Sequence, residues 1–153
     1  MEKVKLQAQY GLYINGQWRN ASDGATYNAE SPADGSHLAV CAQGSREDVE
    51  AASAAAWEAF KTWKTTTPAQ RAALLNKIAD IIDANKEHLA MVESMDNGKP
   101  IRETMNVDIP MAADHFRYFA GCILAEEGQA SVLNEQFLSI ILREPIGVVG
   151  QII

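Results

Sequence analysis

The sequence predicts a mixed α/β fold, and the order of three kinds of pattern along the chain supports this prediction. Strand and turn signals fill residues 10–42, helical periodicities run from residue 45 to about residue 128, and apolar strand-like runs occupy residues 137–153. Early hairpins followed by helices and then by further strands indicate the beginning of an α/β architecture that is not yet complete.

Two β-hairpins are predicted in the first part of the chain. Asn15-Gly16 separates two short runs of strand-forming residues, and this dipeptide favours the positive φ angles of a two-residue hairpin turn. Farther along, Thr26–Glu30 and His37–Cys41 flank Ser31–Gly35, a stretch of turn-forming residues. Both hairpins should therefore precede the first helix.

The change from strands to helices is predicted at Ser45. Ser45 and Asp48 have the spacing of a capping box, in which each side chain accepts a hydrogen bond from the backbone N–H of the other residue. Apolar residues then recur at spacings of 3, 4, 4 and 3 along one helical face: Val49, Ala52, Ala56, Phe60 and Trp63.

A second helix is predicted to start at Pro68, because the missing N–H of proline costs nothing at the first helical position. Its apolar stripe consists of Leu75, Ile78 and Ile82, widened by Leu74 and Ile81. A third helix is expected from about Lys86 to Asn97, and Gly98-Lys99-Pro100 should stop it.

The fourth helical pattern is the longest. Its apolar residues are spaced by 4, 3, 4, 3 and 4: Met105, Ile109, Ala112, Phe116, Phe119 and Ile123. We expect the four helices to pack together through these faces, with Phe116 and Phe119 among the most buried side chains. Pro110 lies inside the pattern, so a kink or break is predicted near Val107 to Ile109.

Two apolar runs close the sequence. Phe137–Leu142 predicts a strand, and Val148–Ile153, which follows the turn residues Pro145 and Gly147, predicts the opening of a strand that is buried on both faces. Such a strand needs a neighbour on each side, and no further residues are present to provide them. We therefore expect the chain to be the front part of a larger protein.

Composition excludes several classes of function. The formal net charge is −7 and the isoelectric point about 4.9, which argues against nucleic acid or an anionic membrane as the main partner. No run of residues is long and apolar enough to form a membrane span, and the first residues lack a secretory signal. The two cysteines stand far apart outside any motif, so a cytoplasmic location is the simplest prediction.

The residue types that most often carry chemistry form no recognisable motif. His37, His88 and His115 are scattered, and no Cys-x-x-Cys pair, nucleophile elbow or phosphate-binding loop occurs. Cys122 and Cys41 lie in apolar surroundings and are interpreted as small, buried hydrophobic residues. His115 follows an aspartate, but adjacent helical residues do not face each other, so a structural role is predicted for it.

The segment Asp96-Asn97-Gly98 allows two interpretations. Its oxygen ligands beside a chain reversal would suit a hard cation, whereas Asn-Gly is also a common helix stop. The spacing alone favours the helix stop.

Several stretches, in this order, resemble the amino-terminal part of the NAD(P)-dependent aldehyde dehydrogenase superfamily, and the resemblance is greatest to its acetaldehyde-type bacterial branch. Together they cover nearly the whole chain: Tyr13–Trp18, Ser31–Gly35, Ala54–Phe60, Pro68–Arg71, Met95–Pro100, His115–Gly121 and Arg143–Ile153.

The resemblance implies that the full-length parent oxidises a small aldehyde to a carboxylate with NAD or NADP. In the family a cysteine thiolate attacks the carbonyl, hydride passes to nicotinamide from the thiohemiacetal, and a glutamate activates the water that hydrolyses the thioester. An asparagine side chain and the backbone N–H of the cysteine hold the oxyanion. All three side chains follow the position matched by Ile153, so this chain is expected to carry no catalytic residue and to be inactive alone.

The resemblance also assigns three kinds of binding residue. Ile152 and Ile153 match the end of the first cofactor-domain strand, next to the nucleotide. Asp96, with the backbone carbonyls of Ala29 and Glu30, matches a structural cation site. The strand Phe137–Leu142 matches the segment that pairs with a neighbouring subunit, so a homo-oligomer is expected.

By the same resemblance, residues 1–131 form the first part of the cofactor-binding domain, residues 132–146 an oligomerisation strand, and residues 147–153 the first strand of a Rossmann-like sheet. Two other interpretations stay open at this point. One is a non-catalytic helical interaction module. The other is a relative that transfers the acyl group to coenzyme A instead of to water.

Overall fold

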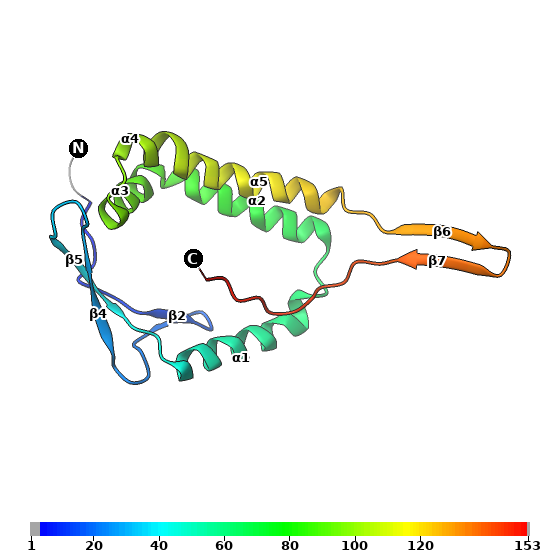
Figure 1. The fold of residues 1–153 in the computed structure, drawn as a ribbon, viewed down its shortest axis with the longest axis horizontal. Coiled ribbons are helices and arrows are strands. Elements are labelled where there is room, and N and C mark those ends of the chain that lie inside the picture. Colours follow the sequence, from blue (N-terminus) through cyan, green and yellow to red (C-terminus); the bar gives the residue numbers. More distant parts are fainter. Residues whose placement is uncertain (1–3, 153) are drawn as a thin grey trace.

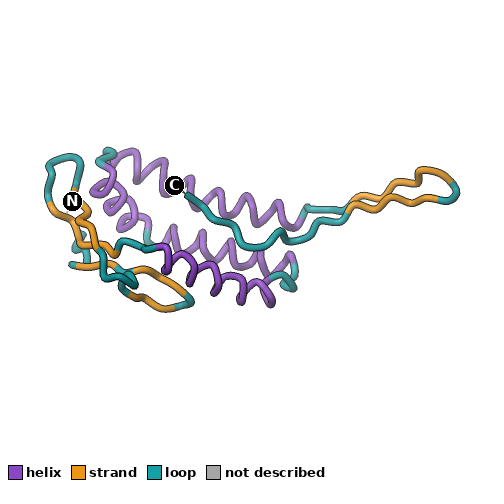
Figure 2. Tube along the Cα trace, turned by 60° about the horizontal axis from the view of Figure 1, so that its bottom comes forward, coloured by secondary structure: helices purple, strands orange, loops and turns teal. Residues whose placement is uncertain are grey.

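The structure is a computed structural model that describes residues 4–152 (Figure 1). Short strands form one end of the molecule, a pair of long helices lies along one side, and a single helix lies along the other. A β-hairpin projects from the opposite end in both views (Figures 1 and 2). The mixed α/β class predicted from the sequence is confirmed.

The two predicted hairpins are present in the first part of the chain. The five strands there are β1 (Gln9–Tyr10), β2 (Leu12–Ile14), β3 (Gln17–Arg19), β4 (Thr26–Glu30) and β5 (His37–Ala42). Asn15 and Gly16 form the β2–β3 turn with φ angles of 52° and 76°, as the Asn-Gly dipeptide predicted. β4 pairs antiparallel with β5, while β1, which the sequence did not reveal, pairs parallel with the other edge of β5.

Helix α1 (Arg46–Trp63) begins with the predicted capping box. The N–H of Asp48 donates to Ser45 Oγ at 3.3 Å, and the N–H of Ser45 donates to Asp48 Oδ2 at 3.0 Å. The predicted apolar face of α1 is only partly covered, since Val49 is 64% and Trp63 46% exposed. This part of the prediction is wrong because α1 packs mainly on β2 instead of on the other helices.

Helices α2 (Pro68–Ala84) and α5 (Ile109–Leu124) form the most extensive helix contact of the structure. The contact is lined by small side chains, and the buried ones are Ala72, Ala79, Ala113 and Ala120. Small residues allow the two backbones to approach closely. At the edge of the contact, Arg117 Nη2 donates to Asp80 Oδ1 at 2.9 Å and to Asp83 Oδ2 at 2.7 Å.

The expectation that Phe116 and Phe119 would be among the most buried side chains is wrong. Phe119 is 54% exposed and Ala112 is exposed, whereas Phe116 is half-buried. Every hydrophobic residue that is buried in the described part of the chain is an alanine. The close approach of the helices leaves no room for an aromatic ring between them, so the rings lie beside the contact. For the same reason Leu74 and Ile81 point away from it and are exposed.

Helix α3 (Lys86–Asn97) has the predicted bounds, and Gly98 ends it with a φ of 75°. A short helix α4 (Ile101–Glu103) and a π-helical turn η1 (Thr104–Asp108) then lead into α5. The π turn ends at Asp108, two residues before Pro110, and so overlaps the region near Val107 to Ile109 where the sequence predicted a kink or break. Thr104 is fully buried there, and its Oγ1 donates to the carbonyl of Ala90 at 2.9 Å.

The strand predicted at Phe137–Leu142 is confirmed as β7 (Phe137–Ile141). Its partner is β6 (Gln129–Asn134), which was not predicted from the sequence, and the two form an antiparallel hairpin. The run Val148–Ile152 is not a strand, contrary to the prediction. A strand requires a hydrogen-bonded neighbour, and none lies beside this run among residues 4–152. Ile153 lies outside the described residues.

Candidate functional site

The corner where α3 ends against the turn after β4 contains the predicted cation ligands. A Cβ added to Gly98 would lie 2.9 Å from Cγ of Pro32, so the helix end touches the chain two residues beyond Glu30. The β4–β5 pairing shifts register between Ala29 and Glu30, and such a bulge changes the direction of the local carbonyl groups. The structure therefore brings Asp96's helix and the Ala29–Glu30 carbonyls to the same corner.

The end of α3 is closed by its own hydrogen bonds. The N–H of Gly98 donates to the Ser94 carbonyl at 3.1 Å, and Ser94 Oγ donates to the Lys99 carbonyl at 2.6 Å. The N–H of Lys99 donates to Asn97 Oδ1 at 2.8 Å. Asn97-Gly98 thus serves as the helix stop that the spacing favoured. The Asp96 carboxylate takes no part in this closure and is exposed.

Electrostatics connect Asp96 to the strands. The pKa of Tyr27 on β4 is raised, chiefly by its cross-strand neighbour Cys41 through charge and a side-chain hydrogen bond, then by burial and by the negative charge of Asp96. Residues 4–152 contain no cluster of three acidic, histidine or cysteine side chains that could hold a metal. An ion at this corner would depend on one carboxylate and backbone carbonyls, which suits a hard cation. Binding at Asp96, Ala29 and Glu30 stays a prediction.

The residues expected to contact the nucleotide lie on an uncovered segment. Ile152 is fully exposed, and Ile153 falls outside the described residues. Within the segment 142–152, only Gly147 and Val148 are partly covered. The indole of Trp57 on α1 covers Gly147.

A hollow of about 370 Å³ on the outer face of α5 is lined by Asp114, His115, Tyr118 and Phe119. His115 Nδ1 lies 2.7 Å from the Met111 carbonyl, one helical turn back, which agrees with the structural role predicted for this histidine. Its neighbour Asp114 is not its partner in this contact.

The cysteines differ from their predicted environments. Cys122 was expected to be buried but is exposed at the end of α5, and its thiol and the Tyr118 hydroxyl interact through a hydrogen bond that raises the pKa of Tyr118. Cys41 is half-buried in β5. Both are free thiols.

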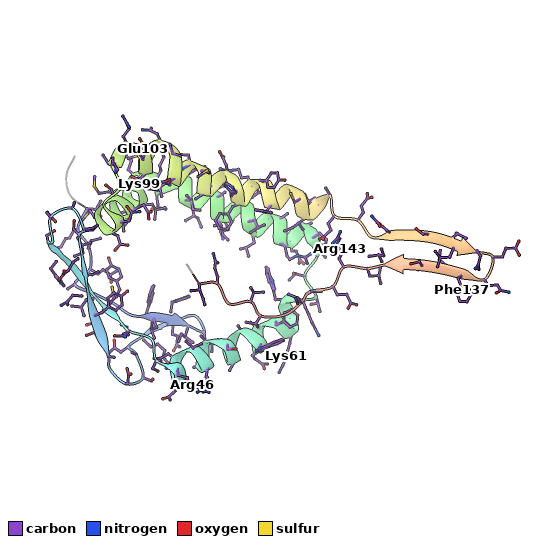
Figure 3. The ribbon with its side chains drawn as sticks, in the orientation of Figure 1. Arg46, Lys61, Lys99, Glu103, Phe137 and Arg143 are labelled. Carbon is purple, nitrogen blue, oxygen red and sulfur yellow. The ribbon has the colours of Figure 1, made fainter. Side chains whose placement is uncertain are left out.

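The β6–β7 hairpin is exposed on both faces but is not symmetric. Directly paired residues share a face, and the pairs Ala130–Ile140 and Val132–Leu138 make one face fully apolar. The opposite face is mixed: it carries the polar pair Ser131–Ser139, the pair Gln129–Ile141 and the exposed ring of Phe137, two residues before Ser139. Figure 3 shows Phe137 near the tip of the hairpin and Arg143 at its base, where Arg143 Nε lies 3.2 Å from Glu126 Oε1. None of the helices within the described range has the length and apolar character to cross a membrane.

Comparison with known proteins identifies the family to which this chain belongs. Residues 18–153 match the sequence pattern described as the aldehyde dehydrogenase family. The chain belongs to the aldehyde dehydrogenase family, as its sequence motifs indicated.

Relatives and solved structures agree with this assignment. The chain is 50% identical over 150 residues to an aldehyde dehydrogenase of Vibrio cholerae, covering 98% of this chain and 30% of that protein. It is 48% identical over 151 residues to a long-chain-aldehyde dehydrogenase of Acinetobacter sp., covering 99% of this chain and 30% of that one.

Among solved structures, PnpE, a protein of Pseudomonas sp. WBC-3, has been determined in complex with nicotinamide adenine dinucleotide. That complex is 40% identical to this chain with a TM-score of 0.86, over 90% of this chain and 28% of PnpE. The chain thus spans about 30% of the length of the curated relatives it matches, and the match lies in their amino-terminal portion.

Proposed function

We propose that this chain is the amino-terminal part of an enzyme that oxidises an aldehyde to a carboxylate with NAD or NADP. The observation that carries the proposal is the match of residues 18–153 to the family, together with 45–50% identity to curated bacterial aldehyde dehydrogenases. The chemistry would follow the family pattern of a cysteine thiohemiacetal, hydride transfer and a thioester. We expect the substrate to be an aldehyde, because the curated relatives are named as dehydrogenases of aldehydes.

The nucleophile, the general base and the oxyanion asparagine would come from residues beyond 153 in the full-length protein. Cys41 and Cys122 are not proposed as nucleophiles. Cys41 faces Tyr27 across a two-strand ladder, and Cys122 lies beside Tyr118 at the end of α5, so neither has a cationic partner in these contacts that would stabilise a thiolate. The isolated chain should therefore be inactive.

The part of the cofactor site that this chain would supply is the segment ending at Ile152 and Ile153. These residues would contact the nucleotide when the remaining strands of the sheet lie beside them. Support comes from the NAD complex of PnpE, to which 90% of the chain is structurally similar.

The Asp96 corner would hold a structural cation through the Asp96 carboxylate and the carbonyls of Ala29 and Glu30. Support comes from the bulge between Ala29 and Glu30 and from the contact of Gly98 with Pro32. The test is thermal unfolding with and without K⁺ or Mg²⁺. Asp96→Asn should lose the stabilisation by the cation, whereas Asp114→Asn on α5 should keep it. An equal response of both variants would contradict the site.

We further propose a homo-oligomer that forms through Phe137–Leu142 in the projecting hairpin. The exposed apolar residues of β7 support this, among them Phe137 at 62% and Ile140 at 60% exposure. A cytoplasmic location agrees with two free cysteines, since thiols stay reduced there.

Reduction of NAD or NADP in the presence of aldehydes tests the main proposal. The full-length protein should reduce the cofactor, and residues 1–153 alone should give no signal above buffer. Activity of the isolated chain that Cys122→Ser abolishes would overturn the assignment. Addition of coenzyme A to the full-length protein decides between the two acyl acceptors, because only a coenzyme-A-acylating enzyme requires it for turnover.

A further inference from the structure

The segment that leaves the hairpin is largely exposed beyond its first residues, which line a hollow beside the end of α1. Figure 1 shows it running back past the end of α1 towards the interior of the molecule. Ile146 is 91%, Val149 75% and Ile152 fully exposed. Gly147 and Val148 are the only partly covered residues between 142 and 152. Their contacts are therefore the main ones that orient the end of the segment.

Gly147 lies directly against the indole of Trp57. A Cβ added at Gly147 would be 2.8 Å from Cη2 and 3.3 Å from Cζ3 of that ring, closer than real Cβ contacts occur. The φ of Gly147 is 124°, a conformation that L-residues with a side chain rarely adopt. Both the backbone angle and the ring contact therefore require glycine at this position.

Trp57 is itself held in place on α1. Its ring packs edge-to-face on Phe60, with centroids 5.7 Å apart and planes at 87°, and Lys64 Nζ lies 5.8 Å from the centroid of the Phe60 ring. The start of α1 is fixed as well, since Arg19 Nη2 donates to Asp48 Oδ1 at 2.9 Å. The indole, although 51% exposed, is thus packed on Phe60 in a helix whose start is anchored at Asp48.

We infer that Trp57 is a positioning residue for the cofactor-binding sheet: the contact of its indole with Gly147, the Gly147 seat, fixes where residues 148–152 begin, and these residues would pair with the remaining strands in the full-length protein. This inference rests on the proposed function, because it takes the segment ending at Ile152 as the one beside the nucleotide. Trp57 does not touch the cofactor. Loss of the seat should therefore weaken use of the cofactor and leave binding of the aldehyde unchanged.

Steady-state kinetics of the full-length enzyme, with NAD and aldehyde varied separately, test the inference. Trp57→Ala and Gly147→Ala should each raise the KM for NAD by about tenfold, with little change in the KM for aldehyde. Trp57→Phe keeps an aromatic ring against Gly147, so its KM for NAD should lie much nearer to that of the unchanged enzyme. The double variant Trp57→Ala/Gly147→Ala should be no worse than the poorer single variant, since both remove one contact.

Two matched controls separate the seat from general damage. Gly121→Ala on α5 adds a Cβ that meets nothing within 4 Å, and Trp18→Ala removes an indole that is 69% exposed on β3. Both controls should keep the KM for NAD of the unchanged enzyme. If Gly121→Ala raises it as much as Gly147→Ala, or if Trp57→Ala leaves it unchanged, the inference is overturned.

Amide hydrogen exchange of residues 148–152 in the same full-length proteins tests the contact between Gly147 and Trp57 independently of catalytic activity. Exchange should accelerate in Trp57→Ala and Gly147→Ala but not in the two controls, and equal exchange in all of them would contradict the seat. An unchanged enzyme that reduces neither NAD nor NADP would refute the proposed function, while the exchange experiment would still decide on the seat. Should Trp57→Ala fail to fold, Gly147→Ala and Trp57→Phe carry both measurements.

Discussion

Arg19 and Asp48 join the first hairpin to the start of α1 through a hydrogen bond of 2.9 Å between Nη2 and Oδ1. The Asp48 side chain is only 2% exposed, and it also accepts from the N–H groups of Ser45 at 3.0 Å and Ser22 at 3.1 Å. These donors lower the pKa of Asp48 from 3.8 to about 2, with Ser45 first and Ser22 second in size and the charge of Arg19 a smaller cause. The carboxylate therefore organises the junction only while it is ionised.

The lowered pKa of Asp48 predicts how stability depends on pH. A carboxyl group whose pKa is lower in the folded than in the unfolded state stabilises the fold above the unfolded value, and this contribution is lost as the pH falls towards the folded value. The loss should lie between pH 3.8 and about 2. Urea unfolding of Asp48→Asn should show a smaller decline across this window than the unchanged chain.

Glu50→Gln is the matched control for this measurement. Glu50 pairs with Arg46 one turn away on the same helix, but both side chains are largely exposed, so the pair contributes little. Its variant should keep the full acid dependence. An identical decline for Asp48→Asn and the unchanged chain would show that Asp48 is not responsible.

A second prediction concerns the buried hydroxyl of Thr104. It donates to the Ala90 carbonyl at 2.9 Å and to the Ile101 carbonyl at 3.2 Å, and so links η1 to α3. Thr104→Val preserves the shape but removes the donor, and it should lower the free energy of unfolding by about 1 kcal/mol. Thr62→Val, which removes an exposed hydroxyl bonded to the Ala59 carbonyl, should cost less in the same denaturation series.

Local signals in the sequence were sufficient for the turns and helix ends. Asn15-Gly16, the Ser45–Asp48 box and the stop at Gly98 act through backbone angles and bonds between near neighbours, so the sequence carries them directly. The parallel pairing of β1 with β5 could not be predicted in this way, because two residues of strand give almost no periodic signal. The role of Asp48 as the partner of Arg19 needed the fold as well, since the two residues lie 29 positions apart.

The candidate site was likewise predicted only in part from the sequence. The family resemblance led to Asp96, Ala29 and Glu30, and the structure places their elements at one corner. The resemblance could not indicate the contact between Gly147 and Trp57. These residues lie in distant segments, and their contact depends on the positive φ angle of Gly147. Helical periodicity also misplaced the buried face of α5. Ala113 and Ala120 carry little weight in an apolar pattern, yet they form the contact with α2.

The alanine contact between α2 and α5 predicts an unusual order of mutational costs. Ala113 is fully buried, and Ala113→Leu should cost about 1–3 kcal/mol because the added atoms push the helices apart. Phe119 is 54% exposed, so Phe119→Ala should cost no more than about 1 kcal/mol. Ala112→Leu, on the exposed side of the same helix, is the control and should leave the denaturation midpoint nearly unchanged. A larger loss for Phe119→Ala than for Ala113→Leu would show that the aromatic face is the packed one.

The last prediction concerns association through the β6–β7 hairpin. A hairpin with unpaired edges and one apolar face tends to recruit another chain, and light scattering should show a mass above one chain at tens of micromolar protein. Removal of residues 136–153 should shift the protein towards monomer.

The two faces of the hairpin should respond differently to an added charge. Leu138→Lys places an ammonium on the face of Ala130, Val132 and Ile140 and should dissociate the assembly, whereas Ser139→Lys lies on the opposite, mixed face and should dissociate it less. Equal dissociation by both variants would show that the contact is not confined to the apolar face. A monomer for the unchanged chain would count against association through this hairpin altogether.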